Sequence, residues 1–296
     1  MAERIFVQMP AYRDRELLPT LDHLLRNAAQ PQRLRVVIAW QYGQDEAALV
    51  RELTRWPQVE LIQIPAKLSQ GVNWARELIQ RRYDGEPYTL LLDSHHRFAP
   101  RWDERLVSMH RALCERGVAK PIVTAYLPPY QPANDPAGRT SCVFKIALHE
   151  RRQGLAFLLR GHAVPQWRCL SEPQPAHFAS LHFLFAPDSF MTMVPIDPSL
   201  YFFADEIAIA LRAFTHGYDL FHPHELLGWH LYDRATRATH WSDHADWRWK
   251  HEATLDRLAA LYSGQIKGRY GIGSVRSVSE FEAHIGLRLT EQLDLT

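Results

Sequence analysis

Short apolar runs alternate with amphipathic stretches along the first 125 residues. Runs of strand length occupy 5–9, 34–40, 59–64, 88–92 and 121–125, and stretches with helical spacing lie between them at 16–29, 45–55, 70–82 and 101–116. Strands that alternate with helices predict an α/β fold with a mainly parallel central sheet covered on both faces. In such sheets ligands bind beyond the carboxyl ends of the strands, so polar residues that directly follow a strand are the first candidates for a site.

The pattern changes in the second part of the chain. Four prolines and a glycine predict a loop at 127–138. The runs 142–148, 155–159 and 182–186 predict strands of a smaller mixed or antiparallel portion, and 205–216, 245–263 and 279–286 predict helices. There is no repeat or low-complexity linker, so we expect one domain over 1–296 with a first half (1–125) and a second half (126–296).

Composition narrows the class of protein. The 34 Lys and Arg nearly balance the 33 Asp and Glu, which argues against binding nucleic acid or an anionic membrane through a global field. Three widely spaced cysteines, Cys114, Cys142 and Cys169, suggest neither a disulfide framework nor a thiolate metal site. No apolar stretch approaches the roughly 20 residues that span a bilayer. We therefore expect a cytoplasmic protein without a membrane span.

The clearest local signal is the apolar run 88–92 followed by Asp93, Ser94 and His95. Two potential ligands separated by one residue point to the same side of an extended backbone, at the edge of the sheet where ligands bind. A carboxylate with an imidazole suits Mn²⁺ or a similar divalent ion better than Ca²⁺. In the alternative interpretation, Asp93 caps a turn and His95 is a polar surface residue, since such tripeptides are common.

Longer motifs extend this signal over nearly the whole chain. They occupy 5–14 with 16–17, 40–41, 71–76, 93–98 with 102–103, 120–121, 194–198, 203–206, 215–218, 230–234 and 271–277. In this order the motifs resemble those of the cytoplasmic N-acetylglucosaminyltransferases that modify hydroxyproline on an F-box adaptor of ubiquitin ligases, together with the bacterial relatives of that family. The resemblance is specific for the family and much less specific for the acceptor.

The resemblance implies a GT-A-like nucleotide-sugar-binding fold, a UDP-sugar donor, UDP-GlcNAc by default, a divalent cation such as Mn²⁺ or Mg²⁺, and retention of anomeric configuration. It makes 1–125 the nucleotide-binding half, and 126–296 the acceptor half with a C-terminal tail that closes over the donor. Asp93 and His95 fall on the family's metal motif. Two departures put the sugar or acceptor preference in doubt: the usual Gly-Glu-Glu is Ala204-Asp205-Glu206, and His96 stands where relatives often carry Met.

Residues near the first strands are candidates for donor binding. Tyr12, Arg13 and Asp14 follow the first strand, where Tyr12 can stack on uracil, Arg13 can pair with a phosphate and Asp14 can bind ribose or uracil groups. Alternatively, Asp14 caps the following helix. Ser94 is a further candidate beside Asp93. Arg76 can reach a phosphate from its helix, although an isolated helical arginine is more often a solvated residue.

Three residues of the second half are candidates for chemistry. Asp205 and Glu206 begin a helix, where the helix dipole alone favours carboxylates, and as a pair they could hold the acceptor hydroxyl or the donor sugar. His230 is the candidate for a third metal ligand, against the alternative that it is one more buried or surface histidine among 16.

The segment 271–277 resembles an anion-binding loop in which Gly273 and Ser274 present backbone amides and Arg276 adds charge, although a lone Gly-x-Gly is a weak signal. Trp241, Trp247 and Trp249 could stack on sugars or belong to the core.

The sequence thus predicts a retaining glycosyltransferase with a nucleotide-sugar donor and an unknown hydroxyl-bearing acceptor, a protein or a glycan. A nucleotide-sugar-binding protein without turnover and a metal-dependent hydrolase are the alternatives.

Overall fold

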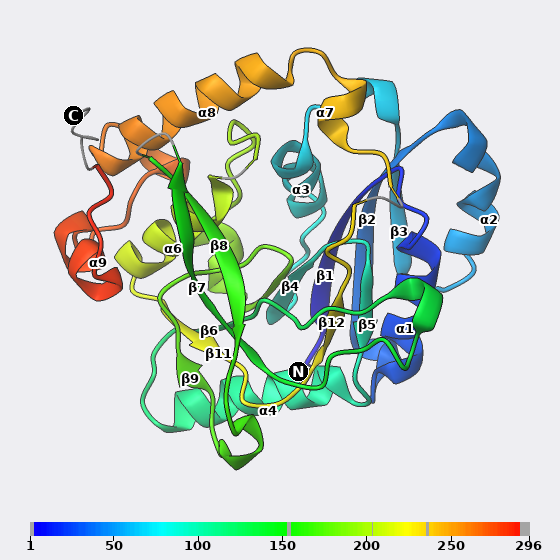
Figure 1. The fold of residues 1–296 in the computed structure, drawn as a ribbon, viewed down its shortest axis with the longest axis horizontal. Helices are drawn as coiled ribbons and strands as arrows, with labels where there is room; N and C mark the ends of the chain where they lie inside the picture. Colours follow the sequence, from blue (N-terminus) through cyan, green and yellow to red (C-terminus); the bar gives the residue numbers. More distant parts are fainter. Residues whose placement is uncertain (1–2, 153–154, 203, 235–236, 291–296) are drawn as a thin grey trace.

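The computed structural model describes residues 3–152, 155–202, 204–234 and 237–290. Its centre is an eight-stranded sheet with the strand order β3-β2-β1-β4-β10-β6-β11-β9 (Figure 1). The strands are β1 (Ile5–Tyr12), β2 (Leu34–Tyr42), β3 (Val59–Pro65), β4 (Tyr88–Leu92), β6 (Pro121–Thr124), β9 (Gln174–Pro175), β10 (Phe183–Pro187) and β11 (Asp219–His222). Strands β3, β2, β1 and β4 are parallel, whereas β10 runs antiparallel to both of its neighbours. The predicted α/β fold with a mainly parallel sheet is confirmed.

Helices cover both faces of this sheet. They are α1 (Leu17–Asn27), α2 (Val50–Leu53), α3 (Val72–Gln80), α4 (Trp102–Glu115), α5 (Ser189–Met193), α6 (Asp205–Thr215), α7 (His240–Asp243), α8 (Trp247–Tyr262) and α9 (Val278–Ile285). The apolar residues of α1 and α4 pack on one face of β1, β2 and β4, and those of α3 pack on the other. None of the described helices is long and apolar enough to cross a membrane.

Two small sheets complete the fold and were only partly predicted. Strand β5 (His96–Phe98) pairs with β12 (Gly228–His230), and β7 (Phe144–Arg152) pairs with β8 (Ala156–Ala163). The prediction of β7 and β8 is confirmed, whereas β5, β9, β11 and β12 are too short to show a period in the sequence. The predicted helix at 45–55 is wrong in its first half, which is a 3-10 helix over Gln44–Leu49 whose Glu46 side chain accepts from the Gly43 amide.

The β5–β12 ladder matters most for the site. Its register places His230 opposite His96, so it brings a histidine from late in the chain beside the segment that follows β4. Because β1 and β4 are adjacent and parallel, the residues after Tyr12 and after Leu92 emerge at the same edge of the sheet. The fold therefore assembles Asp14, Asp93, His95 and His230 in one place.

The segment after α8 packs against the end of α6. The Gly273 amide donates to Thr215 Oγ1 at 2.9 Å, and a Cβ at this glycine would lie 2.3 Å from the Thr215 carbonyl oxygen. Nearby, the ring of Phe281 on α9 packs against that of Phe214 on α6. The glycine is thus required by the close approach of two backbones.

Replacing Gly273 by alanine should lower the free energy of unfolding by about 1–3 kcal/mol, because the added methyl group forces this backbone away from α6. Urea unfolding of G273A beside S274A, whose side chain is exposed, measures the difference. Equal stability of the two variants would contradict this account of the glycine.

Candidate active site

A cavity of about 370 Å³ opens at the carboxyl ends of β1 and β4. Ten of the residues singled out in the sequence line it, and they come from both halves of the chain: Tyr12, Asp14, Arg76, Asp93, Ser94, His95, Asp205, Glu206, His230 and Trp241. Arg13, Gly273, Ser274 and Arg276 are not among the lining residues. The fold therefore brings most of the predicted site together.

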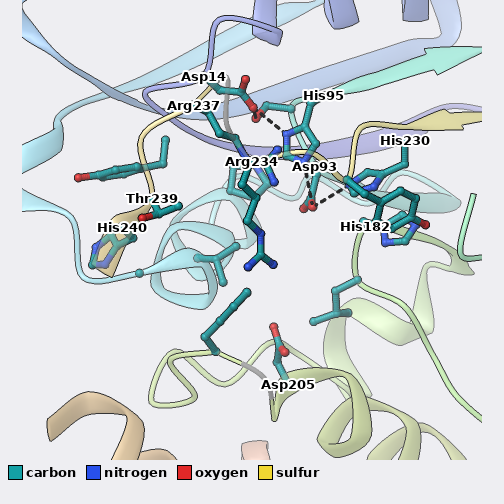
Figure 2. A pocket seen from close by; sticks show the side chains of 18 of the residues that line it. Asp14, Asp93, His95, His182, Asp205, His230, Arg234, Arg237, Thr239 and His240 are labelled. Carbon is teal, nitrogen blue, oxygen red and sulfur yellow. Dashed lines mark hydrogen bonds and ion pairs between the residues drawn. The ribbon is translucent and has the colours of Figure 1, made fainter. Parts of the chain in front are cut away.

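Asp93, His95 and His230 converge at the deep end of this cavity. One potential ligand atom from each lies within 4.8 Å of the other two. His95 Nε2 and His230 Nε2 lie 3.7 and 3.5 Å from the same carboxylate oxygen, Asp93 Oδ2 (Figure 2). Asp93 follows β4 directly and His230 ends β12, so two short strands fix the ends of this triad.

Asp14 orients His95. Its Oδ2 lies 2.7 Å from His95 Nδ1 and accepts from Ser94 Oγ at 2.6 Å, while its Oδ1 accepts from the Glu16 amide. Burial opposes ionisation of Asp14, but the hydrogen bonds from His95 and Ser94 keep its pKa below the usual value. The Nδ1 proton of His95 therefore points at Asp14, and the Nε2 lone pair faces Asp93.

The structure gives Asp14 and Ser94 a role behind the triad, while their predicted donor contacts stay predictions. Both were expected to contact the donor, but in the structure the carboxylate of Asp14 is occupied by the imidazole behind the triad and Ser94 Oγ by that carboxylate. The alternative that Asp14 caps the following helix agrees in part with the structure, since Asp14 Oδ1 accepts a hydrogen bond from the Glu16 amide, which directly precedes α1.

Arg76 orients Asp93 and does not project into the cavity as a free cation. Its Nη2 donates to Asp93 Oδ1 and to the Leu181 carbonyl, both at 2.9 Å, and its Nη1 lies 3.9 Å from Asp205 Oδ2. Arg76 also lines the cavity, and its expected phosphate contact stays a prediction. Desolvation opposes ionisation of Asp93, yet His230, Arg76 and His95 hold its pKa well below the usual value.

The triad fits a divalent cation. Among the described residues, His95 Nε2 and both ring nitrogens of His230 are buried without a hydrogen-bond partner. Burial lowers the pKa of His230 well below its usual value, so the ring is neutral, which is the form that binds metals. A cation between Asp93 and the two Nε2 atoms would provide the partner that those two nitrogens lack, and the donor set of one carboxylate and two imidazoles suits a transition metal.

Sequence reasoning did not find the role of the segment Ser180–Leu181–His182 in the site. The His182 ring stacks on His230 with centroids 4.2 Å apart. His182 Nε2 accepts from the Leu127 amide at 3.2 Å, and its Nδ1 lies 2.9 Å from Ser180 Oγ, so this imidazole supports His230 and has no lone pair left for a metal. Because β10 is antiparallel to β4, the residues just before β10 lie at the same edge of the sheet as Asp93. Only this strand order, which the sequence does not show, places His182 in the site.

Asp205 and Glu206 line the side of the cavity that faces α6. Asn73 Nδ2 donates to Asp205 Oδ2 at 3.1 Å, and Tyr126 donates from its hydroxyl to Glu206 Oε2 at 2.7 Å. Desolvation and the neighbouring Asp205 raise the pKa of Glu206 to about 7, and burial also raises the pKa of Asp205. Glu206 therefore gains or loses a proton near neutral pH. Phe203, which precedes this pair, lies outside the described residues.

Helix α7 closes the end of the cavity near β1. Asp243 accepts hydrogen bonds from Tyr12 Oη and Arg13 Nη1, both at 2.7 Å. His240 links Tyr201 Oη (2.7 Å) to Ser69 Oγ (3.0 Å), and its ring lies 5.1 Å from that of Tyr12. Tyr12 lines the cavity, whereas Arg13 forms an ion pair with Asp243 and its predicted phosphate contact stays a prediction.

Two arginines that sequence reasoning did not select also line the cavity. Arg234 and Arg237 follow β12, and Figure 2 shows Arg234 between the triad and Asp205. Neither forms an ion pair with a described carboxylate, and Arg237 Nη1 is buried without a described hydrogen-bond partner. Arg234 packs on Trp241, which also lines the cavity. Two unmatched cations beside a candidate metal centre suit an anionic ligand.

The predicted anion-binding loop at 271–277 lies elsewhere. The Gly273 amide is bound to Thr215, and Arg276 pairs with Asp219 and donates to the Tyr218 carbonyl oxygen. The Ser274 side chain is exposed to solvent. This segment therefore packs against α6 outside the cavity lining, and the predicted anion contacts of Gly273, Ser274 and Arg276 stay predictions. Trp249, in turn, does not belong to the core, since it is 69% exposed.

Comparison with known proteins identifies the class. The chain matches the family described as Glycosyltransferase (GlcNAc) over residues 4–55 and 43–291. It belongs to this glycosyltransferase family. No curated protein matches the sequence.

Solved structures of similar fold agree with this glycosyltransferase assignment. GalNAc-T7 with UDP, GalNAc and Mn²⁺ aligns with a TM-score of 0.62 at 13% identity, covering 96% of this chain and 55% of that one. A mannosyltransferase of Pyrobaculum calidifontis with GDP-Man and Mn²⁺ aligns with a TM-score of 0.53 at 13% identity, covering 90% of this chain and 65% of that one. S. aureus TarS 1-349 with UDP-GlcNAc aligns with a TM-score of 0.52 at 12% identity, covering 81% of this chain and 60% of that one. The chain therefore has the predicted GT-A fold, and it spans about 55–65% of the length of these proteins.

The raised pKa of Glu206 predicts a pH-dependent stability in this glycosyltransferase. A carboxyl whose pKa is higher in the folded state binds more protons there, so its contribution is fully present at acidic pH and is lost as pH rises through about 7. E206Q, which cannot ionise, should therefore gain stability relative to the wild type between pH 5 and pH 8. Thermal melts at pH 5, 6, 7 and 8 measure this, and parallel curves for the two proteins would contradict it.

Proposed function

We propose that this chain is a metal-dependent, retaining glycosyltransferase that transfers a sugar, GlcNAc by default, from a UDP-sugar to a hydroxyl acceptor. One observation carries the proposal: Asp93, His95 and His230 converge in a cavity that also contains Asp205 and Glu206. The triad fits Mn²⁺ or Mg²⁺, with the imidazoles favouring Mn²⁺.

The comparisons support this proposal at a coarser level. Structures of similar fold contain UDP with GalNAc and Mn²⁺, UDP-GlcNAc, or GDP-Man with Mn²⁺. The family description favours GlcNAc among these sugars. Retention, and hydroxyproline as the first acceptor to test, rest on the resemblance of the sequence motifs. A cytoplasmic location accords with three unpaired cysteines.

Each wall of the cavity has a part in the proposed reaction. A bound cation would stabilise the charge that develops on the departing diphosphate. Arg234 and Arg237 supply further positive charge there, and Tyr12 offers a ring at the nucleoside end. In the transfer, the bond from the anomeric carbon to the diphosphate breaks and a bond to the acceptor oxygen forms on the same face, while the acceptor proton passes to the leaving phosphate. Asp205 and Glu206 then hold hydroxyl groups and are not required as a base.

Measuring turnover of the nucleotide sugar distinguishes the proposed transferase from a binding protein without turnover and from a hydrolase. Purified protein is incubated with a panel of UDP- and GDP-sugars and Mn²⁺, and release of nucleoside diphosphate is measured with and without candidate acceptors. A transferase releases nucleotide faster with an acceptor and yields a glycosylated product. Donor binding without release would indicate a binding protein. Release that no acceptor accelerates, with free sugar as the sole product, would indicate a hydrolase.

The triad itself is tested by H230A. Loss of one of three ligands should abolish metal-dependent nucleotide release, lowering it at least 100-fold, while H149A, which removes an exposed histidine of β7, should retain it. Circular dichroism and thermal melts establish that both variants are folded. A folded H230A with wild-type Mn²⁺ dependence would show that the triad is not the metal site.

Asp14 provides a test that does not depend on turnover. In D14N the amide can donate to His95 Nδ1, which shifts the ring proton to Nε2 and blocks the proposed ligand atom. Mn²⁺ affinity should therefore fall about 10–100-fold. Electron paramagnetic resonance of free Mn²⁺ during titration measures it, with D45N, an exposed aspartate, as the matched control. Equal affinities for D14N and D45N would refute the role of Asp14.

A further inference from the structure

Strand β8 has a free edge. Strands β7 and β8 form a sheet of two, so each has one neighbouring strand among the described residues. The outer edge of β7 is covered in part, because the Ile146 amide donates to His222 Nε2 of β11 at 3.2 Å. The outer edge of β8 has no such cover. In Figure 1 this edge lies on the side of the hairpin toward β4 and β1.

The ladder determines which backbone groups of β8 face outward. The Val164 amide donates to the Val143 carbonyl at 2.9 Å, so position 164 faces β7. Hydrogen-bonding positions alternate along an antiparallel strand, hence the amide and carbonyl groups of Phe157, Leu159 and Gly161 face away from β7. These outward amides and carbonyls have no hydrogen-bond partner among the described residues.

This edge borders the active-site cavity. Phe157, Leu158 and Leu159 all line the cavity. Because successive side chains of a strand point to opposite faces, three consecutive lining residues indicate that the cavity meets the strand from its edge. The edge is also close to the carboxyl pair: Gly161 packs against Tyr126, since a Cβ there would lie 3.2 Å from Tyr126 Cβ, and the Tyr126 hydroxyl binds Glu206.

We propose that the acceptor is an extended peptide segment that pairs with β8 as a third strand and presents its hydroxyl side chain toward Asp205 and Glu206. This inference rests on the proposed function. Unpaired donors and acceptors that recur at every second residue are matched by another extended backbone. A chain of sugar rings does not repeat its hydrogen-bonding groups in that way. The partly exposed side chain of Leu158 offers an apolar contact that does not depend on one particular acceptor sequence, whereas the side chains of Phe157 and Leu159 are buried in the core.

Backbone pairing makes a specific prediction for acceptor peptides. Ten-residue peptides with a central serine, threonine or hydroxyproline and randomised flanks are incubated with the protein, Mn²⁺ and the donor that it hydrolyses, and products are found by mass spectrometry. The best acceptor is then N-methylated at alternate residues in two complementary sets. The set whose amides face β8 should lose transfer at least tenfold, while the other set retains it. Equal effects of the two sets would overturn the proposal.

Leu159 allows a matched test on the enzyme. L159P removes the outward amide, whereas L159A removes similar packing and keeps the amide, and neither change touches a hydrogen bond to β7. The KM for the peptide should be about tenfold higher in L159P than in L159A, the effect of losing one hydrogen bond of about 1.4 kcal/mol. Equal KM values in two folded variants would contradict edge pairing.

The outcomes distinguish this inference from the proposed function. If donor hydrolysis and transfer to oligosaccharides proceed but no peptide is glycosylated, the transferase assignment stands and the peptide acceptor is wrong. If no nucleotide sugar is turned over, the proposed function fails first, and with it the basis of this inference.

Discussion

The carboxylate of Asp93 is the point on which the site depends. One of its oxygens accepts from Arg76, and the other faces the imidazoles of His95 and His230. A carboxylate in a partly enclosed site is stable only when its charge is compensated, and here one permanent cation does so from behind. This leaves the second oxygen directed at the cavity. Arg76 thus holds the carboxylate in the orientation that a metal would require.

The groups around Asp93 are held together by a short piece of backbone. The Leu181 carbonyl accepts from Arg76, the Leu181 amide donates to Glu206, and the neighbouring His182 stacks on His230. A shift of this turn would therefore disturb the candidate metal centre and the carboxyl pair at once. The antiparallel strand β10, inserted between β4 and β6, fixes the turn at the active edge. The single reversed strand in the middle of the sheet accordingly has a direct consequence for the site.

The sequence predicts the strands and helices around the site well, because the regular spacing of apolar residues shows which face of each element is buried. It also predicts that Asp93 belongs to the site, since an apolar run that is followed directly by an aspartate can be recognised in the sequence itself. Asp14 and Arg76 were assigned to the donor because the sequence does not show that they lie behind His95 and Asp93. His182 and Arg237 carry no local signal at all, and their places follow from strand order and from the path of the chain after β12. The loop at 271–277 shows a different ambiguity, since in the sequence a glycine needed for close packing looks the same as a glycine needed to bind an anion.

Most charged groups of the cavity are paired with one another, and an anionic donor would pair with the cations that are left. The Asp14 carboxylate is hydrogen-bonded by His95 and Ser94 and the Asp93 carboxylate pairs with Arg76, whereas Arg234 and Arg237 have no described carboxylate partner. The site without ligand therefore keeps unpaired positive charge on the side formed by the chain after β12, beside the candidate metal centre. A diphosphate placed between the two would be contacted by cations from both halves of the chain. Because His230 and Arg234 are joined by a few residues of the same segment, binding of a metal and of a diphosphate would restrain one piece of chain, and each should favour the other.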